Sequence, residues 1–167
     1  MSEIPSTFTA VAVKRMKLSE AMIYRCLDQL TEAQLWYRAA DYENSIANLL
    51  LHLAGNMRQW ILHGIDHQPD VRRRDEEFAL TPTMSAAQAR AHFTATLAES
   101  CNVIAAVPAE RLLELTDPQP GGGWGEVTLI EVILLIAGHL QLHAGQIILL
   151  TKQILARDLD LTLPRKR

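Results

Sequence analysis

Residues 134–150, LLIAGHLQLHAGQIILL, place two histidines four residues apart inside a long apolar run. Burying an imidazole without a hydrogen-bonding partner is costly. His139 and His143 are therefore either two core histidines whose hydrogen bonds are satisfied or two ligands of a metal ion. The apolar run has no proline from about residue 128 to 156, so it predicts one long helix.

Both sides of this expected helix are apolar. At 100° per residue, the side that carries His139 also carries Val132, Leu135, Ile136, His143, Gln146 and Leu150. The opposite side carries Ile133, Ala137, Ala144, Ile148 and Leu155. A helix that is apolar all round is buried on two sides. In a bundle of this size the second side would pack against a partner subunit, so we predict a homodimer.

Three further segments have helical periodicity, at residues 7–30, 45–63 and 85–107. Ser45 (or Asn44) and Ser85 are suitable N-caps, Thr31 can cap a short turn, and Gly64 and Pro108 follow helix ends. Strand signals are nearly absent. We predict an all-α four-helix bundle in which residues 1–167 form a single domain.

Composition excludes several classes of function. The net charge of -3, with 21% charged residues, gives no electrostatic case for binding nucleic acid or an anionic membrane. The start of the chain lacks the pattern of a signal peptide, and the apolar run falls short of a clean membrane span. Cys26 and Cys101 have no C-x-x-C spacing and suit free thiols. We therefore expect a cytoplasmic protein with no nucleic-acid or membrane partner.

The histidine pair requires a third ligand if it is to hold a metal ion. His139 and His143 lie one helical turn apart, a spacing at which two imidazoles can bind one ion. His52 is the third candidate, because it lies in a polar stripe on the expected helix 45–63 that also includes Asn48, Asn56, Gln59 and His63. His63 lies about 16 Å further along that helix and cannot share the ion. A second H-x-x-x-H pair, His63 and His67, straddles Gly64 and is a weaker candidate.

The alternative is that each histidine hydrogen-bonds a backbone carbonyl or a nearby Asn or Gln. Gln146 could line the site, orient a bound water, or make a polar contact in the core. If a metal is bound, three neutral imidazoles with open positions suit a catalytic or ligand-binding ion. Zn or Ni is then expected first, with Fe or Mn also compatible.

Three blocks, NSIANLLLHLAGNMRQWI, DVRRRDEEFA and EVTLIEVILLIAGHLQLHAGQI, resemble the DinB-like family of bacterial proteins. The resemblance covers about residues 19–154. It implies the DinB/YfiT-like four-helix bundle, a dimer, and a divalent metal on three histidines, here His52, His139 and His143. Relatives include S-transferases and isomerases that use a low-molecular-weight thiol. We therefore predict a metal-dependent enzyme, a thiol S-transferase or a hydrolase, in which the ion activates a small-molecule thiol or water for attack on a small electrophile. The alternative is a bundle that binds metal or ligand without catalysis.

Two other features have open roles. Asp75, Glu76 and Glu77 could supply a general base at the open end of the bundle, although a solvated charged loop held by residues 72–74 is the favoured interpretation. Trp124, after three glycines, could close over the site or anchor its loop.

Overall fold

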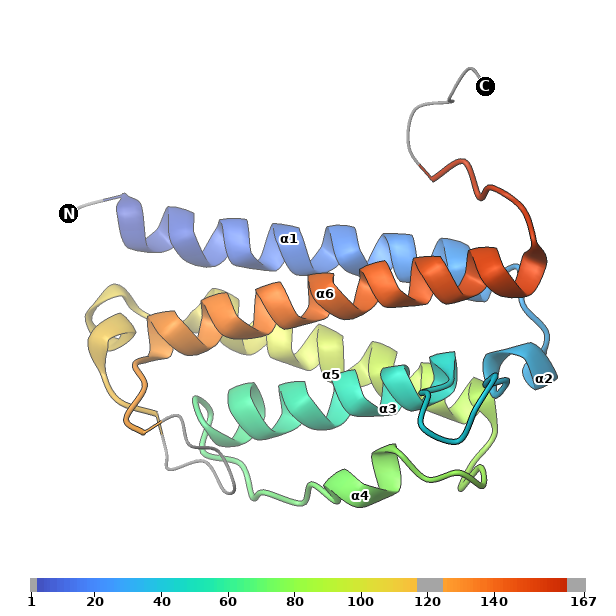
Figure 1. The fold of residues 1–167 in the computed structure, drawn as a ribbon. Helices are drawn as coiled ribbons and strands as arrows, with labels where there is room; N and C mark the ends of the chain where they lie inside the picture. Colours follow the sequence, from blue (N-terminus) through green and yellow to red (C-terminus); the bar gives the residue numbers. More distant parts are fainter. Residues whose placement is uncertain (1–2, 117–124, 162–167) are drawn as a thin grey trace.

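The computed structural model describes residues 3–116 and 125–161, and Figure 1 shows their arrangement. Four long segments run roughly side by side: α1 (Ile4–Leu27), α3 (Ile46–Met57) with its π-helical extension η1 (Arg58–His63), α5 (Ala86–Ala106) and α6 (Leu129–Leu155). Shorter elements join them: α2 (Glu32–Leu35), α4 (Arg74–Glu77) and the 3-10 helix η2 (Ala109–Leu113). The described residues contain no strand, only an isolated bridge between Leu115 and Thr128.

The long helices pack as a four-helix bundle, as the sequence predicts. Around the bundle α1 contacts α6, α6 contacts α3, α3 contacts α5, and α5 contacts α1. Their buried sides form one apolar core that includes Met16, Ile23, Leu50, Phe93 and Ile136. Because α3 and α6 are neighbours, side chains from residues about 90 apart in the chain can meet between them.

Capping boxes define where the helices begin. In each, the side chain three residues after the N-cap accepts a hydrogen bond from the N-cap backbone N–H. In the first three pairs below, the N-cap hydroxyl also accepts a hydrogen bond from the backbone N–H three residues on. The pairs are Thr31 with Gln34, Ser45 with Asn48, Ser85 with Gln88, and Thr128 with Glu131. Helix starts were therefore readable from the sequence to within one residue for the last three long helices.

Two boundaries differ from the expectation. Helix α1 begins and ends three residues earlier than the expected 7–30, because Pro5 is tolerated in a first helical turn and the backbone tightens after Leu27. The expected helix 45–63 changes from α to π geometry at Arg58, where Gly64 N–H donates to the carbonyl of Gln59. The hydropathy pattern gives no sign of this change.

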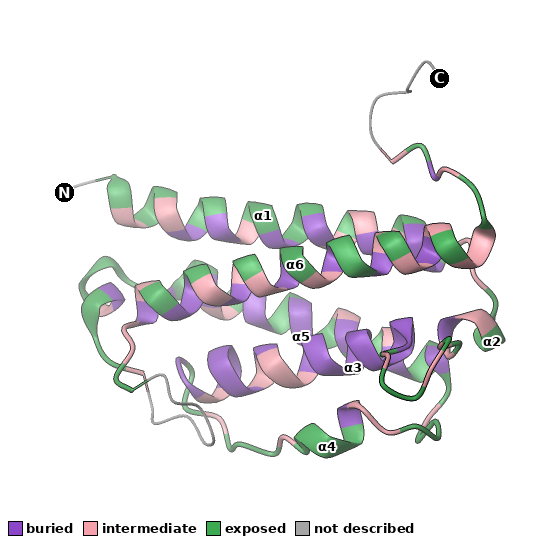
Figure 2. Ribbon diagram, viewed as in Figure 1, coloured by how far each residue is buried: buried purple, intermediate pink, exposed green. Residues whose placement is uncertain are grey.

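The second apolar side of α6 packs within the chain. Ile133 and Ala144 are buried, and Ala144 and Ile148 lie beside α1 residues such as Leu18 and Met22. The prediction that this side packs against a partner subunit is therefore wrong for Ile133 and Ala144, which the chain itself buries. A different stripe on α6 remains exposed and includes Leu134, Leu142 and Leu149 (Figure 2). The homodimer itself stays a prediction.

Candidate metal centre

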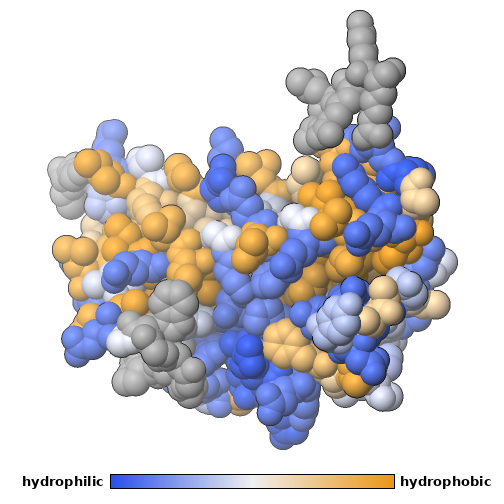
Figure 3. Space-filling model, in the orientation of Figure 1, coloured by the Kyte–Doolittle hydropathy of each residue, from blue (hydrophilic) through white to orange (hydrophobic). Residues whose placement is uncertain are grey.

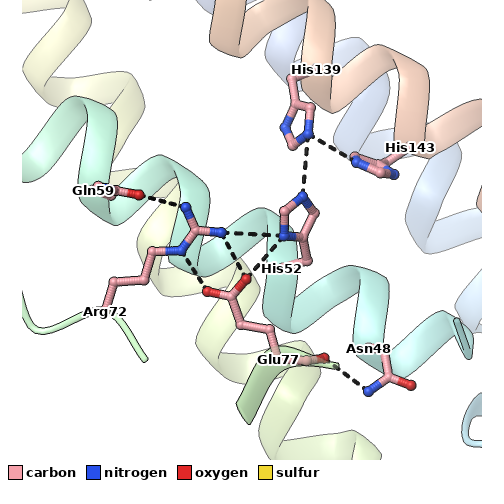
Figure 4. Close-up of polar contacts among 7 residues, drawn as sticks. All are labelled: Asn48, His52, Gln59, Arg72, Glu77, His139 and His143. Atoms are coloured by element: carbon pink, nitrogen blue, oxygen red, sulfur yellow. Dashed lines mark hydrogen bonds and ion pairs between the residues drawn. The ribbon is translucent and has the colours of Figure 1, made fainter. Parts of the chain in front are cut away.

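Three imidazole rings converge between α3 and α6 (Figure 4). His52 projects from α3, and His139 and His143 project from successive turns of α6. The Nε2 atom of His139 lies 3.3 Å from Nε2 of His52 and 2.9 Å from Nε2 of His143. One ring nitrogen from each residue lies within 4.8 Å of the other two. The structure thus brings together the three histidines that the sequence singles out.

The spacing and charge of these nitrogens fit a divalent ion. Ligands at about 2.0–2.1 Å with tetrahedral angles stand about 3.3 Å from one another, close to the two distances from Nε2 of His139, and the third pair of nitrogens lies within 4.8 Å. Burial, followed by the neighbouring His143 and His52, lowers the pKa of His139 from 6.5 to about 4. Burial also lowers the pKa of His143, against the opposing hydrogen bond with Gln146. Both rings are therefore neutral near pH 7, the state in which imidazole binds a metal.

The outer nitrogens of the two α6 histidines have different surroundings. His143 Nδ1 lies 2.6 Å from Oε1 of Gln146 and donates to it, which leaves the Nε2 lone pair directed at the other rings. The sequence did not predict this role for Gln146, which orients a histidine; Gln146 is exposed, so the expected polar contact in the core is wrong. His139 Nδ1 is buried and has no hydrogen-bond partner among the described residues.

A carboxylate holds the outer nitrogen of His52. Nδ1 of this ring donates to Oε2 of Glu77 at 2.9 Å, so its Nε2 faces the other two histidines. Arg72 donates from Nε to Oε1 at 2.7 Å and from Nη2 to Oε2 at 2.8 Å. Burial alone would raise the pKa of Glu77, but the hydrogen bonds from Arg72 and His52 outweigh it and the pKa is lowered. Glu77 is therefore an ionised carboxylate that hydrogen-bonds the outer nitrogen of His52, a contact of the kind that orients histidine ligands in metal sites.

The acidic residues 75–77 only partly match the solvated charged loop that the sequence favoured. Asp75 and Glu76 are exposed, and Glu76 pairs with exposed Arg73, so these two match a solvated charged loop. That interpretation is wrong for Glu77, which is buried. Asn48 explains how the segment docks, because its Nδ2 donates to the Glu77 carbonyl at 2.9 Å.

The weaker histidine pair does not join the cluster. His63 ends η1, and its Nδ1 lies 2.8 Å from the carbonyl of Gln68. His67 has a left-handed backbone with φ of 56°, outside any helix. Trp124 lies outside the described residues.

A surface cleft of about 520 Å³ reaches His139. Most of its described lining is apolar and comes from α6, including Leu134, Leu135 and Leu142. The three-ring cluster is therefore next to a space that an apolar group can enter.

The chain matches the family model of the DinB superfamily over residues 15–147. The match covers most of the chain, and the protein belongs to this superfamily. The search of curated proteins finds no match.

Proposed function

We propose that this protein is a divalent-metal-dependent enzyme in which His52, His139 and His143 hold the ion. The observation that carries the proposal is the convergence of three ring nitrogens within 4.8 Å, two of them on rings with lowered pKa. Membership of the DinB superfamily is compatible with it. Zn or Ni suits an all-imidazole ligand set best, and Fe or Mn is also accommodated.

A divalent ion at this position, when bound, would lower the pKa of a thiol or water and so supply a nucleophile near neutral pH. The chain contributes the orientation of the ligands: Glu77 holds His52 and Gln146 holds His143.

A low-molecular-weight thiol is the nucleophile we favour over water. Glu77 lies on the outer nitrogen of His52, away from the side where the three rings meet. Three N–H donors, two from Arg72 and one from His52, already occupy its carboxylate. It is poorly placed to act as the general base that hydrolysis would use. A thiol ionises more readily than water and needs such a base less. Its sulfur would bond to an electrophilic carbon while the leaving group departs with its bonding electrons.

The alternative function is a bundle that binds metal or ligand without catalysing a reaction. The position of Glu77 favours this alternative, because its carboxylate orients the ring of His52 and does not face a substrate. Turnover separates the two functions.

The test is conjugation of a chromogenic electrophile with a panel of bacterial low-molecular-weight thiols, using zinc-loaded protein. Wild type should exceed the uncatalysed rate, and His143→Ala should fall to it. His63→Ala is the matched control, because His63 lies outside the cluster, and it should retain the wild-type rate. Equal rates for wild type and His143→Ala would exclude thiol transfer at this site. Zinc bound by wild type without any turnover would support the binding alternative.

We also propose that the protein forms a homodimer in the cytoplasm. Leu134, Leu142 and Leu149 form a stripe on α6 and are 66%, 60% and 57% exposed. Gly138 and Gly145 lie on the same stripe and leave open space beside the helix backbone. Figure 3 shows apolar residues on this side of the molecule. By length and composition α6 could also cross a membrane, but it packs here as one wall of the bundle, so we interpret the stripe as a protein contact.

Light scattering at micromolar concentration tests the dimer. Wild type should have twice the monomer mass, and Leu142→Glu should have the mass of a monomer. A monomeric wild type would contradict the dimer, and its metal site would be unaffected because the ligands come from one chain.

A further inference from the structure

Gly55 lies where the Glu77 carboxylate meets the backbone of α3. A Cβ atom built at Gly55 would stand 2.0 Å from Oε1 and 2.8 Å from Cδ of Glu77. Atoms that close overlap, so this space can hold the carboxylate only because residue 55 has no side chain. Glycine weakens a helix relative to alanine, and close approach of Glu77 accounts for its use here.

The carboxylate has little freedom to move aside. Two hydrogen bonds from Arg72 and one from His52 hold its oxygens, and its side chain is only 7% exposed. Asn48 holds the Glu77 backbone at the same time. A methyl group at residue 55 would therefore push the carboxylate off the Nδ1 atom of His52.

This contact bears on metal binding through the tautomer of His52. When Nδ1–H donates to Glu77, the Nε2 lone pair is directed at the rings of His139 and His143. Without the carboxylate, Nδ1 and Nε2 can each carry the proton, and the ring loses the contact that fixes its orientation.

We infer that Gly55 is a positioning residue for the three-histidine site: it admits the Glu77 carboxylate, which presents His52 Nε2 to the ion. The inference rests on the proposed metal site. It makes Gly55 a residue that affects the affinity for the ion without contacting any of the three histidines.

The experiment compares Gly55→Ala with Gly145→Ala, a matched substitution on α6 whose new Cβ would meet nothing within 4 Å in its own chain. Gly145 lies on the stripe proposed for the dimer, but all three histidines come from one chain, so the substitution leaves the metal site intact. Each variant is titrated with Zn²⁺ alone against a competing chelator, after circular dichroism has confirmed its helix content. Zn²⁺ should bind 10- to 100-fold more weakly to Gly55→Ala and with unchanged affinity to Gly145→Ala. Equal affinity of wild type and Gly55→Ala would overturn the inference.

A double-mutant cycle tests whether Gly55→Ala weakens Zn²⁺ binding through the Glu77 carboxylate or by another route. Glu77→Ala should weaken Zn²⁺ binding by itself, and adding Gly55→Ala to it should cost little more, because the colliding carboxylate is gone. A full additional loss in the double variant would show that Gly55 acts by another route.

A metal-free measurement keeps this inference distinguishable from the proposed function. Nitrogen-15 NMR of the apo protein should show His52 protonated on Nδ1 in wild type and Gly145→Ala, and a mixture of tautomers in Gly55→Ala. If wild type binds no Zn²⁺, the metal function fails, whereas the NMR comparison still tests the role of Gly55. The same tautomer in all three proteins would overturn that role.

Discussion

Removal of the Arg72 guanidinium should destabilise the protein strongly. Arg72 and Glu77 are each only 7% exposed at the side chain, and Arg72 makes two hydrogen bonds to the carboxylate. A buried charge that loses its partner costs about 3–5 kcal/mol. In a chain of 167 residues each kcal/mol shifts the melting temperature by roughly 2–4 °C, so Arg72→Ala should melt about 6–20 °C lower.

Arg73→Ala is the matched control for this prediction. Arg73 is the next residue, but its side chain is 77% exposed and its partner Glu76 is 59% exposed. Such a surface pair is worth at most about 1 kcal/mol. The melting temperature of Arg72→Lys should lie between those of Arg72→Ala and Arg73→Ala, because lysine keeps the positive charge but cannot make the bidentate contact with the carboxylate. Calorimetry on the three variants checks the order, and equal melting temperatures for Arg72→Ala and Arg73→Ala would refute the reasoning.

Three other perturbations test the ion, the neutral histidines and the cap of α6. Zn²⁺ at 100 times its dissociation constant should stabilise the protein by about 2.7 kcal/mol, or roughly 5–11 °C, and a similar shift in His52→Ala would contradict the site. The metal-free protein should lose up to about 3 kcal/mol as the pH falls from 6.5 towards 4, since the unfolded chain takes up a proton at His139 before the folded chain does. Urea titrations at several pH values should show that the free energy of unfolding depends less on pH in His139→Gln than in wild type. An unchanged pH dependence would count against this explanation. Thr128→Ala should lower the free energy of unfolding, measured in urea, by about 1 kcal/mol, because it removes the hydrogen bond from the Thr128 hydroxyl to the Glu131 carboxylate at the start of α6. No loss would show that this contact is not stabilising.

Much of the fold was predictable because its signals are local. A capping residue and the acceptor three positions on lie within one turn of each other, as Ser85 and Gln88 do. Apolar periodicity then gave the type and approximate length of each long helix. The π-helix at Arg58 was not predictable, since its hydrogen-bond pattern changes without any change in side-chain character.

The candidate site was predictable only in its inner part. His139 and His143 were predicted from their spacing on one helix, and His52 was predicted from its position in a polar stripe on another helix. Glu77 lies 25 residues beyond His52, at the end of the short helix α4 and shortly after three arginines, where the charge pattern favours a solvated surface. The docking contact from Asn48 and the space at Gly55 bury it, and neither is visible before the chain is folded.

The α6 residues that the sequence suggested for a dimer interface are partly covered by α1. The periodicity of α6 showed that apolar side chains surround the helix, but not which of them α1 would cover. Once α1 covers Ala144 and Ile148, the stripe through Leu142 is the apolar surface left on α6.

The most direct test of the account is X-ray diffraction from zinc-loaded crystals at the zinc absorption edge. We expect one anomalous peak between α3 and α6, about 2.0–2.1 Å from Nε2 of His52, His139 and His143. Zinc-loaded crystals with no peak among these three rings, or with peaks only at surface residues, would contradict it.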